Sequence, residues 1–214
     1  METLSRSIDR EALAKLFSRW RQEGRRVLAP RKIGDRIDFA EVSSPDEVSF
    51  DHVQTVQSPK TALFPRVEEL FRFMDRDGRL ELRGRDPDEL RETVVFGLRP
   101  CDAAAFAALA AIFNWDQADS LFSARLQRTT LIGVSCSRSD QCCFCTSVGG
   151  GPGSTAGSDI LLTDMGDGRF LAEVVSDKGR REWQRDESLF GPAGGGDKES
   201  RLAKVERMFD LSLV

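Results

Sequence analysis

Four of the five cysteines of this chain fall within ten residues, at Cys136, Cys142, Cys143 and Cys145, and the fifth is Cys101. Thiolates are ligands for zinc and for iron–sulfur clusters, and they are also the nucleophiles of thiol enzymes. Thiols stay reduced in the cytoplasm, where we expect this protein. The grouping therefore favours metal ligands or reactive thiols over disulfides.

Two of these cysteines follow short apolar segments with the composition of buried strands. TVVFGL precedes Cys101, and TTLIGV precedes Cys136. The carboxyl ends of two such strands meet at one edge of a parallel sheet, which is the usual binding edge. The alanine-rich AAAFAALAAIF predicts a helix just after Cys101. We therefore expect Cys101 at a strand-to-helix junction, where free backbone amides can donate to sulfur.

The other three cysteines lie in SRSDQCCFCTSVGGGPG, a polar loop whose glycines permit close backbone approach. In an extended segment Cys143 and Cys145 point the same way at about 7 Å, which suits two corners of a cluster. Adjacent Cys142 and Cys143 then point to opposite sides, so one of them is spare. Cys142 stays open as a substitute for Cys143. The expected site consists of Cys101, Cys136, Cys143 and Cys145.

Five ordered motifs give the chain a resemblance to a known family. Within roughly residues 58–180 they are KTALFPRVEELF, VVFGLRPCDAAAF, LIGVSC, CFCTSVGGGP and LLTDMGDGRFLAEVVSDKG. In this order they resemble the iron–sulfur beta-subunit family of cytoplasmic sulfhydrogenases and anaerobic sulfite reductases. The resemblance implies one 4Fe–4S cluster on the cysteines of RPCD, SC and CFC, which are Cys101, Cys136, Cys143 and Cys145.

Larger subunits of that family continue into a ferredoxin-like domain with two cysteine-rich cluster motifs. The 214 residues contain no such motif, so only the N-terminal module is resembled and no relay through further clusters is implied. The resemblance implies a non-catalytic electron-transfer subunit of a multi-subunit cytoplasmic oxidoreductase, of hydrogenase or reductase type. Its expected partners are other subunits of that complex, in particular a chain that contains flavin or iron–sulfur clusters.

Two other functions compete with the electron carrier. Four thiolates also suit a tetrahedral zinc site, which would make the chain a structural adaptor of a redox complex, with zinc or without a metal. The one CxxC pair, Cys142 and Cys145, has no second pair to match it, so the spacing argues weakly against zinc. The third function is a thiol enzyme or redox sensor, in which Cys101 and Cys136 are buried core residues and CCFC is reactive.

Composition excludes several other classes of protein. Of the 214 residues, 40% are hydrophobic, which is enough for a core without disulfides. The 31 basic and 35 acidic residues give a net charge of -4, which offers no general attraction to nucleic acid or anionic lipid. No run of 18 apolar residues and no secretory signal core is present. These features predict a cytoplasmic protein without membrane insertion.

The remaining pattern predicts a mixed α/β (α+β) fold, with a central mixed sheet, helices packed on it, and a C-terminal hairpin and helix. Asp9 is expected to cap a helix that Gly24 ends. RRVLAP and DRIDFAEV read as strands, and FPRVEELFRFM reads as a helix opened by Pro65. RDGRLELRG and LLTDMGDGRFLAEVV have the pattern of hairpins.

The expected domain organisation is a single cluster-binding α/β domain at 1–185, followed at 186–214 by a mobile connection and an amphipathic helix. By glycine and charge content, the connection begins slightly earlier, at REWQR, residues 181–185. The helix after it has Leu202, Val205, Met208 and Phe209 on one side.

Three further polar residues have two interpretations each. His52 is the single histidine, and a solvated loop histidine is favoured over a partner of a catalytic cysteine. Arg99 and Arg138 flank ligand positions. If they face a cluster, they favour its reduced form and raise its potential, and otherwise they are ordinary surface arginines.

Overall fold

The computed structural model describes residues 4–210, with side chains up to Val205. Its helices are α1 (Arg10–Gln22), α2 (Pro100–Phe113), α3 (Ser120–Gln127), α4 (Asp177–Arg185) and α5 (Asp197–Asp210). Its strands are β1 (Leu4–Asp9), β2 (Arg26–Ile33), β3 (Arg36–Glu41), β4 (Phe71–Arg76), β5 (Arg79–Gly84), β6 (Thr93–Leu98), β7 (Thr129–Val134), β8 (Ile160–Asp164), β9 (Arg169–Val174) and β10 (Gly191–Pro192).

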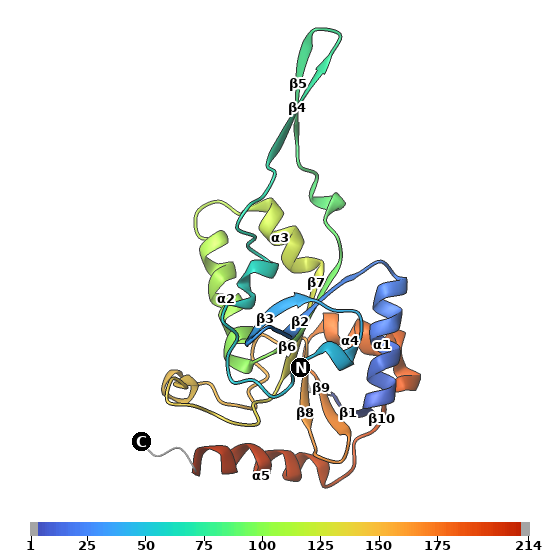
Figure 1. Cartoon of the computed structure of the whole chain (residues 1–214), viewed down its shortest axis with the longest axis vertical. Helices are drawn as coiled ribbons and strands as arrows, with labels where there is room; N and C mark the ends of the chain where they lie inside the picture. Colours follow the sequence, from blue (N-terminus) through green and yellow to red (C-terminus); the bar gives the residue numbers. More distant parts are fainter. Residues whose placement is uncertain (1–3, 211–214) are drawn as a thin grey trace.

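Within residues 4–210, eight strands form one mixed sheet in the order β10-β1-β9-β8-β7-β6-β2-β3, and β4 and β5 form a separate hairpin. The central strands β2, β6, β7 and β8 are parallel to one another. The outer strands on both sides pair antiparallel. Figure 1 shows this sheet inside the body of the protein, with the β4–β5 hairpin projecting away from it. The expected mixed fold with a central mixed sheet is confirmed.

Helices pack on both faces of the central sheet. Successive side chains of a strand point to opposite faces, so one strand contributes to the core on each side. On one face Phe96 of β6 packs in a cluster with Phe17 and Trp20 of α1. Its neighbour Val95 belongs to a second cluster with Phe106 of α2. Every residue of β6 and of β7 is buried, as expected for central parallel strands. These two strands anchor the segments that carry Cys101 and Cys136.

Several local predictions are confirmed. Asp9 caps α1 by accepting a hydrogen bond from the Ala12 amide at 2.8 Å. Gly24 follows α1 in the left-handed region, at a φ of 74°. LLTDMGDGRFLAEVV forms the β8–β9 hairpin, and Gly166 and Gly168 in its turn both have positive φ.

The helix expected in FPRVEELFRFM is wrong. Residues 71–76 form β4, which pairs antiparallel with β5. The segment has apolar residues at both helical and alternate spacing, so periodicity alone does not decide its structure. Asp77 and Gly78 have positive φ values of 56° and 75°, which is the two-residue turn favoured by hairpins. This turn pairs the segment with β5 and makes it a strand.

Residues 181–185 are not a mobile connection but the end of α4. This helix buries Glu182 and Trp183, and Glu182 accepts two hydrogen bonds from Nη1 of the buried Arg25, at 2.8 and 2.9 Å. A buried carboxylate with such a partner holds the helix against the sheet. Charge content alone did not reveal this, because Glu and Arg look the same in sequence whether they are solvated or paired.

The connection after α4 supplies β10, which pairs with β1, and α5 forms the expected C-terminal helix. The side chains of Met208 and Phe209 lie outside the described residues. The boundary at residue 185 remains a prediction. Over the described range, no helix is both long and apolar enough to cross a membrane.

We predict that Gly157→Ala destabilises the protein by about 3 kcal/mol. Gly157 has a φ of 79°, and a Cβ there would lie 2.1 Å from the carbonyl oxygen of Ala103 in α2, so both backbone strain and a clash oppose the change. Gly24→Ala is the matched control, with a similar φ but nothing within 4 Å, and should cost about 1–2 kcal/mol. Urea unfolding measures both, and equal losses would contradict the role of the contact with α2.

Candidate functional site

All five cysteines line one cavity of about 730 Å³ beyond the carboxyl ends of β6 and β7. We call it the thiol cavity. Parallel pairing of the two strands brings Cys101 and Cys136 to the same edge, as predicted. Its other walls are residues 53–55 and Ser58, the start of α2, and the loop from Ser139 to Ala156. The wall at residues 53–55 precedes the family motifs, and no sequence signal assigned it to the site.

Cys101 is the second residue of α2, which begins at Pro100. Burial raises the pKa of the Cys101 thiol, as does the carboxylate of Asp102, whereas the nearby backbone amides of Asp102 and Cys101 lower it. The amides at the start of α2 thus lie near this sulfur, and their donation to a thiolate remains a prediction. It would stabilise a thiolate once a ligand group compensates the burial.

The loop that carries the other cysteines folds back onto Cys136. The Cys136 amide donates to the Pro152 carbonyl at 2.9 Å, and the Gly150 amide donates to the Cys145 carbonyl at 2.8 Å. A Cβ at Gly150 would lie 3.2 Å from that carbonyl oxygen. The GGGPG segment thus serves as a close bend around the cysteines.

The expected extended geometry of CFC is wrong. Phe144 has a φ of -134° and a ψ of 14°, and Cys145 begins a short 3₁₀ turn that ends at Gly149 with a φ of 76°. Cys143 instead accepts a hydrogen bond from the Asp140 amide at 3.4 Å. Alternation therefore cannot decide which of Cys142 and Cys143 shares a site with Cys145.

Charge interactions link Cys143 to the other thiols of the cavity. The pKa of Cys136 is raised to about 12, first by burial and then, against the lowering effect of Arg99, by Cys101, Cys145 and Cys143. Cys145 likewise raises the pKa of Cys101 and of Cys143, after the larger effect of burial in each case. Cys101, Cys143 and Cys145 are therefore electrostatic neighbours of Cys136.

These raised pKa values have a chemical consequence. Reactive cysteines have lowered pKa values, because the thiolate is the nucleophile. Cys101, Cys136 and Cys143 are shifted in the opposite direction, which disfavours the thiol enzyme. Thiols that stay protonated at neutral pH release their protons when a positively charged metal group binds them.

The donor set suits a metal group that is bound by thiolates. Four thiolates are the ligands of a 4Fe–4S cluster and also of a structural zinc ion, and the cavity that the cysteines line has room for either group. In residues 4–205, no three His, Cys, Asp or Glu side chains stand close enough to hold a metal ion as they are placed.

Arg99 joins three segments beside the thiol cavity. Its side chain is 1% exposed, which corrects the interpretation as a surface arginine. It donates to the carbonyls of Ser135 at 3.1 Å, of Phe50 at 2.7 Å and of His52. Within the described part of the chain its Nε has no hydrogen-bond partner. The guanidinium thus brings a buried positive charge to the cavity wall.

His52 is buried, 4% exposed, so the interpretation as a solvated loop histidine is wrong. Its Nδ1 lies 2.8 Å from the Ser49 carbonyl, and because a carbonyl only accepts, Nδ1 carries the proton. Burial and then the charge of Arg99 lower its pKa to about 4. Arg138, in contrast, is exposed and pairs with Asp51 at 3.2 Å.

Helix α5 contacts the loop that carries the cysteines. Arg201 is buried and forms an ion pair with Glu173 of β9 at 2.8 Å, and it also donates to the Gly153 carbonyl. A Cβ at Gly153 would lie 2.9 Å from Nη2 of Arg201. Sequence reasoning did not assign this arginine to the site, because nothing local links it to a loop so far away in the chain.

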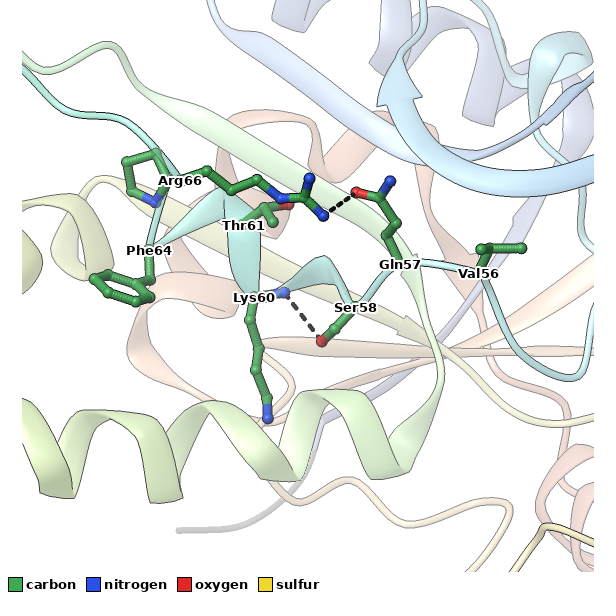
Figure 2. A pocket seen from close by; sticks show the side chains of 8 residues that line it. Val56, Gln57, Ser58, Lys60, Thr61, Phe64 and Arg66 are labelled. Carbon is green, nitrogen blue, oxygen red and sulfur yellow. Dashed lines mark hydrogen bonds between the residues drawn. The ribbon is translucent and has the colours of Figure 1, made fainter.

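A second cavity of about 450 Å³ adjoins the thiol cavity, and Ser58 lines both. Figure 2 shows Arg66 donating to Gln57, and Lys60 extending toward a neighbouring helix. Its described lining residues include two cations, Lys60 and Arg66, but no thiol or carboxylate. It offers no ligand set for a metal group.

Comparison with known proteins supplies one relative. The beta subunit of sulfhydrogenase 2 from Pyrococcus furiosus is 28% identical to this chain over 183 residues, which is 84% of this chain and 51% of that subunit. The chain therefore spans about half the length of the curated relative that it matches. No family model matches the chain.

We predict that His52 stays neutral in the folded protein well below its ordinary pKa. A single histidine gives an unambiguous NMR titration, and in the iron-free chain we expect a midpoint near pH 4 against about 6.5 in urea. Between these values the unfolded chain takes up a proton that the folded chain does not. Stability should therefore fall with decreasing pH by up to about 1.4 kcal/mol per pH unit. A folded-state midpoint near 6.5 would contradict the burial.

Proposed function

We propose that the chain is a member of the sulfhydrogenase beta-subunit family, on the basis of its similarity to the beta subunit of sulfhydrogenase 2, and that it is an electron-transfer subunit of an oxidoreductase complex. In this proposal one 4Fe–4S cluster binds in the thiol cavity. Its ligands are Cys101, Cys136, Cys143 and Cys145. The observation that carries the proposal is that these four thiols, supplied by two parallel strand ends and one loop, line one cavity. In addition to burial, Cys145 raises the pKa values of the other three.

The chain's own residues would contribute in three ways. A bound cluster would supply one-electron oxidation and reduction. The thiols of Cys101, Cys136 and Cys143 must lose protons to bind it, and the amides at the start of α2 stabilise the resulting negative charge. Arg99 holds a positive charge beside the cavity, which favours the more negative, reduced form.

We further propose that the chain works with partner subunits in the cytoplasm. The relative is named as one subunit of a sulfhydrogenase. A single cluster takes up and returns one electron at a time, so it needs a donor and an acceptor, which we expect to be a flavin or another cluster in a neighbouring chain. A structural adaptor with zinc uses the same thiols, and metal analysis separates the two functions.

Anaerobically purified chain should contain about four irons and about four acid-labile sulfides, with an electron paramagnetic resonance signal after dithionite reduction. Serine in place of Cys101, Cys136, Cys143 or Cys145 should reduce the iron content strongly. Cys142→Ser is the matched control and should keep it. Iron-free protein after anaerobic reconstitution, or zinc in the same site, would refute the carrier and support the adaptor.

Arg99→Gln should lower the reduction potential of the cluster, on the order of tens of millivolts, because it removes a buried positive charge next to the reduced form. Arg99→Lys keeps the charge and should retain most of the potential. Arg138→Gln alters an exposed ion pair and should change it little. A redox titration followed by electron paramagnetic resonance measures all three, and an unchanged potential in cluster-loaded Arg99→Gln would exclude the effect.

A further inference from the structure

The β4–β5 hairpin, residues 71–84, projects from the body at one end of the molecule, and we call it the arm (Figure 1). In the described structure its two strands pair with each other and join no other sheet. Five of the six residues in β4 and all six in β5 are exposed. An isolated two-stranded hairpin is marginally stable in water unless something packs against it.

One side of the arm is mainly apolar, with Asp75 opposite Leu80 near the turn. Phe73 lies directly opposite Leu82 in the register of the strands, and by alternation Phe71 and Leu80 share their side. These four side chains are 59–72% exposed. They form a contiguous apolar patch, which we call the apolar face. Patches of this kind on a soluble protein mark interaction sites.

The opposite side carries arginines, and we call it the arginine face. Arg72 lies opposite Arg83, and Arg76 lies opposite Arg79. Like charges placed directly opposite each other destabilise a hairpin, so two such pairs favour a nearby anionic surface. Glu81 is the one acidic residue of this face among residues 71–84. Three of the arginines form exposed ion pairs within the chain, Arg72 with Glu69, Arg76 with Glu81 and Arg83 with Glu89. Arg79 takes part in none of the ion pairs of the described residues.

Stacking against the arm of a second copy does not account for both faces. Each face measures about 20 Å by 10 Å, or about 200 Å², whereas a stable interface needs about 800 Å² from each partner. Two arms stacked through their apolar faces would remain below that value and would leave the arginines in solvent. An occupant that contacts both faces buries about twice the area of the arm that stacking through one face would bury.

We propose that the arm inserts into a groove of another protein subunit, one that offers an apolar floor to the apolar face and carboxylates to the arginine face. This inference rests on the proposed function, which supplies the complex. Figure 1 shows the arm extending past α3, whereas the loop with the cysteines lies elsewhere on the body. Docking through the arm therefore fixes the partner while the thiol cavity stays accessible for electron transfer.

The test compares tagged full-length chains purified from the cells that make them. Phe73→Ser with Leu82→Ser should weaken binding of the partner by at least about 100-fold. Arg76→Glu with Arg79→Glu should weaken it by about 10-fold or more at low salt, with a smaller loss at high salt. Ile112→Ser with Trp115→Ser removes exposed apolar groups on the body and should leave binding unchanged.

Native mass spectrometry and sedimentation during dilution measure the complex, with the partner identified by its mass and its flavin or iron–sulfur absorbance. Circular dichroism checks that the variants are folded, which we expect because the substituted side chains are exposed. Full retention of the partner by the folded arm variants would overturn the proposal. The iron content of the chain is measured in the same samples. If the chain contains no iron but the arm variants still lose the partner, the electron carrier is refuted and the docking surface is supported.

Other occupants give distinct results. Concentration-dependent dimers of the purified wild-type chain that disappear in the Phe73 and Leu82 variant would assign the arm to a second copy. Sedimentation with phosphatidylserine vesicles, abolished in the Arg76 and Arg79 variant, would assign it to an anionic membrane. Either result would overturn the proposed protein groove.

Discussion

Parallel pairing of β6 and β7 is the constraint on which the site depends. The two strands run side by side at the centre of the sheet and are fully buried. The segments that follow them leave the sheet at the same edge. Cys101 and Cys136 are thereby held close together although 34 other residues separate them in sequence. Arg99 reinforces this edge, because its hydrogen bonds to Ser135 and Phe50 connect the ends of both strands to a third segment.

The buried polar groups around this edge act as connectors between layers. Arg25 reaches Glu182 of α4 and Thr130 of β7, and Arg201 reaches Glu173 and the loop around the cysteines. Each of these arginines would be costly to bury alone, and each has a carboxylate partner or carbonyl acceptors. The apolar layers give the fold its stability, and these pairs select one arrangement of helices and loop.

Sequence patterns predicted what depends on neighbouring residues. The Asp9 cap, the buried strands before Cys101 and Cys136, and the β8–β9 turn each have a local cause, and all are present. The patterns failed where distant partners decide. Phe71–Arg76 forms a strand because it pairs with β5. His52 is buried beside Arg99, which donates to its carbonyl. The identity of the proposed ligands beyond Cys101 and Cys136 depends on the path of a loop, which no periodicity describes.

The contact between α5 and Gly153 also sets an order of steps during synthesis and folding of the chain. Gly153 and Arg201 are 48 residues apart, so a ribosome synthesises all the cysteines well before the arginine that braces their loop. During that interval the nascent loop has no contact with α5. Packing of the loop against the helix therefore follows synthesis of the last helix.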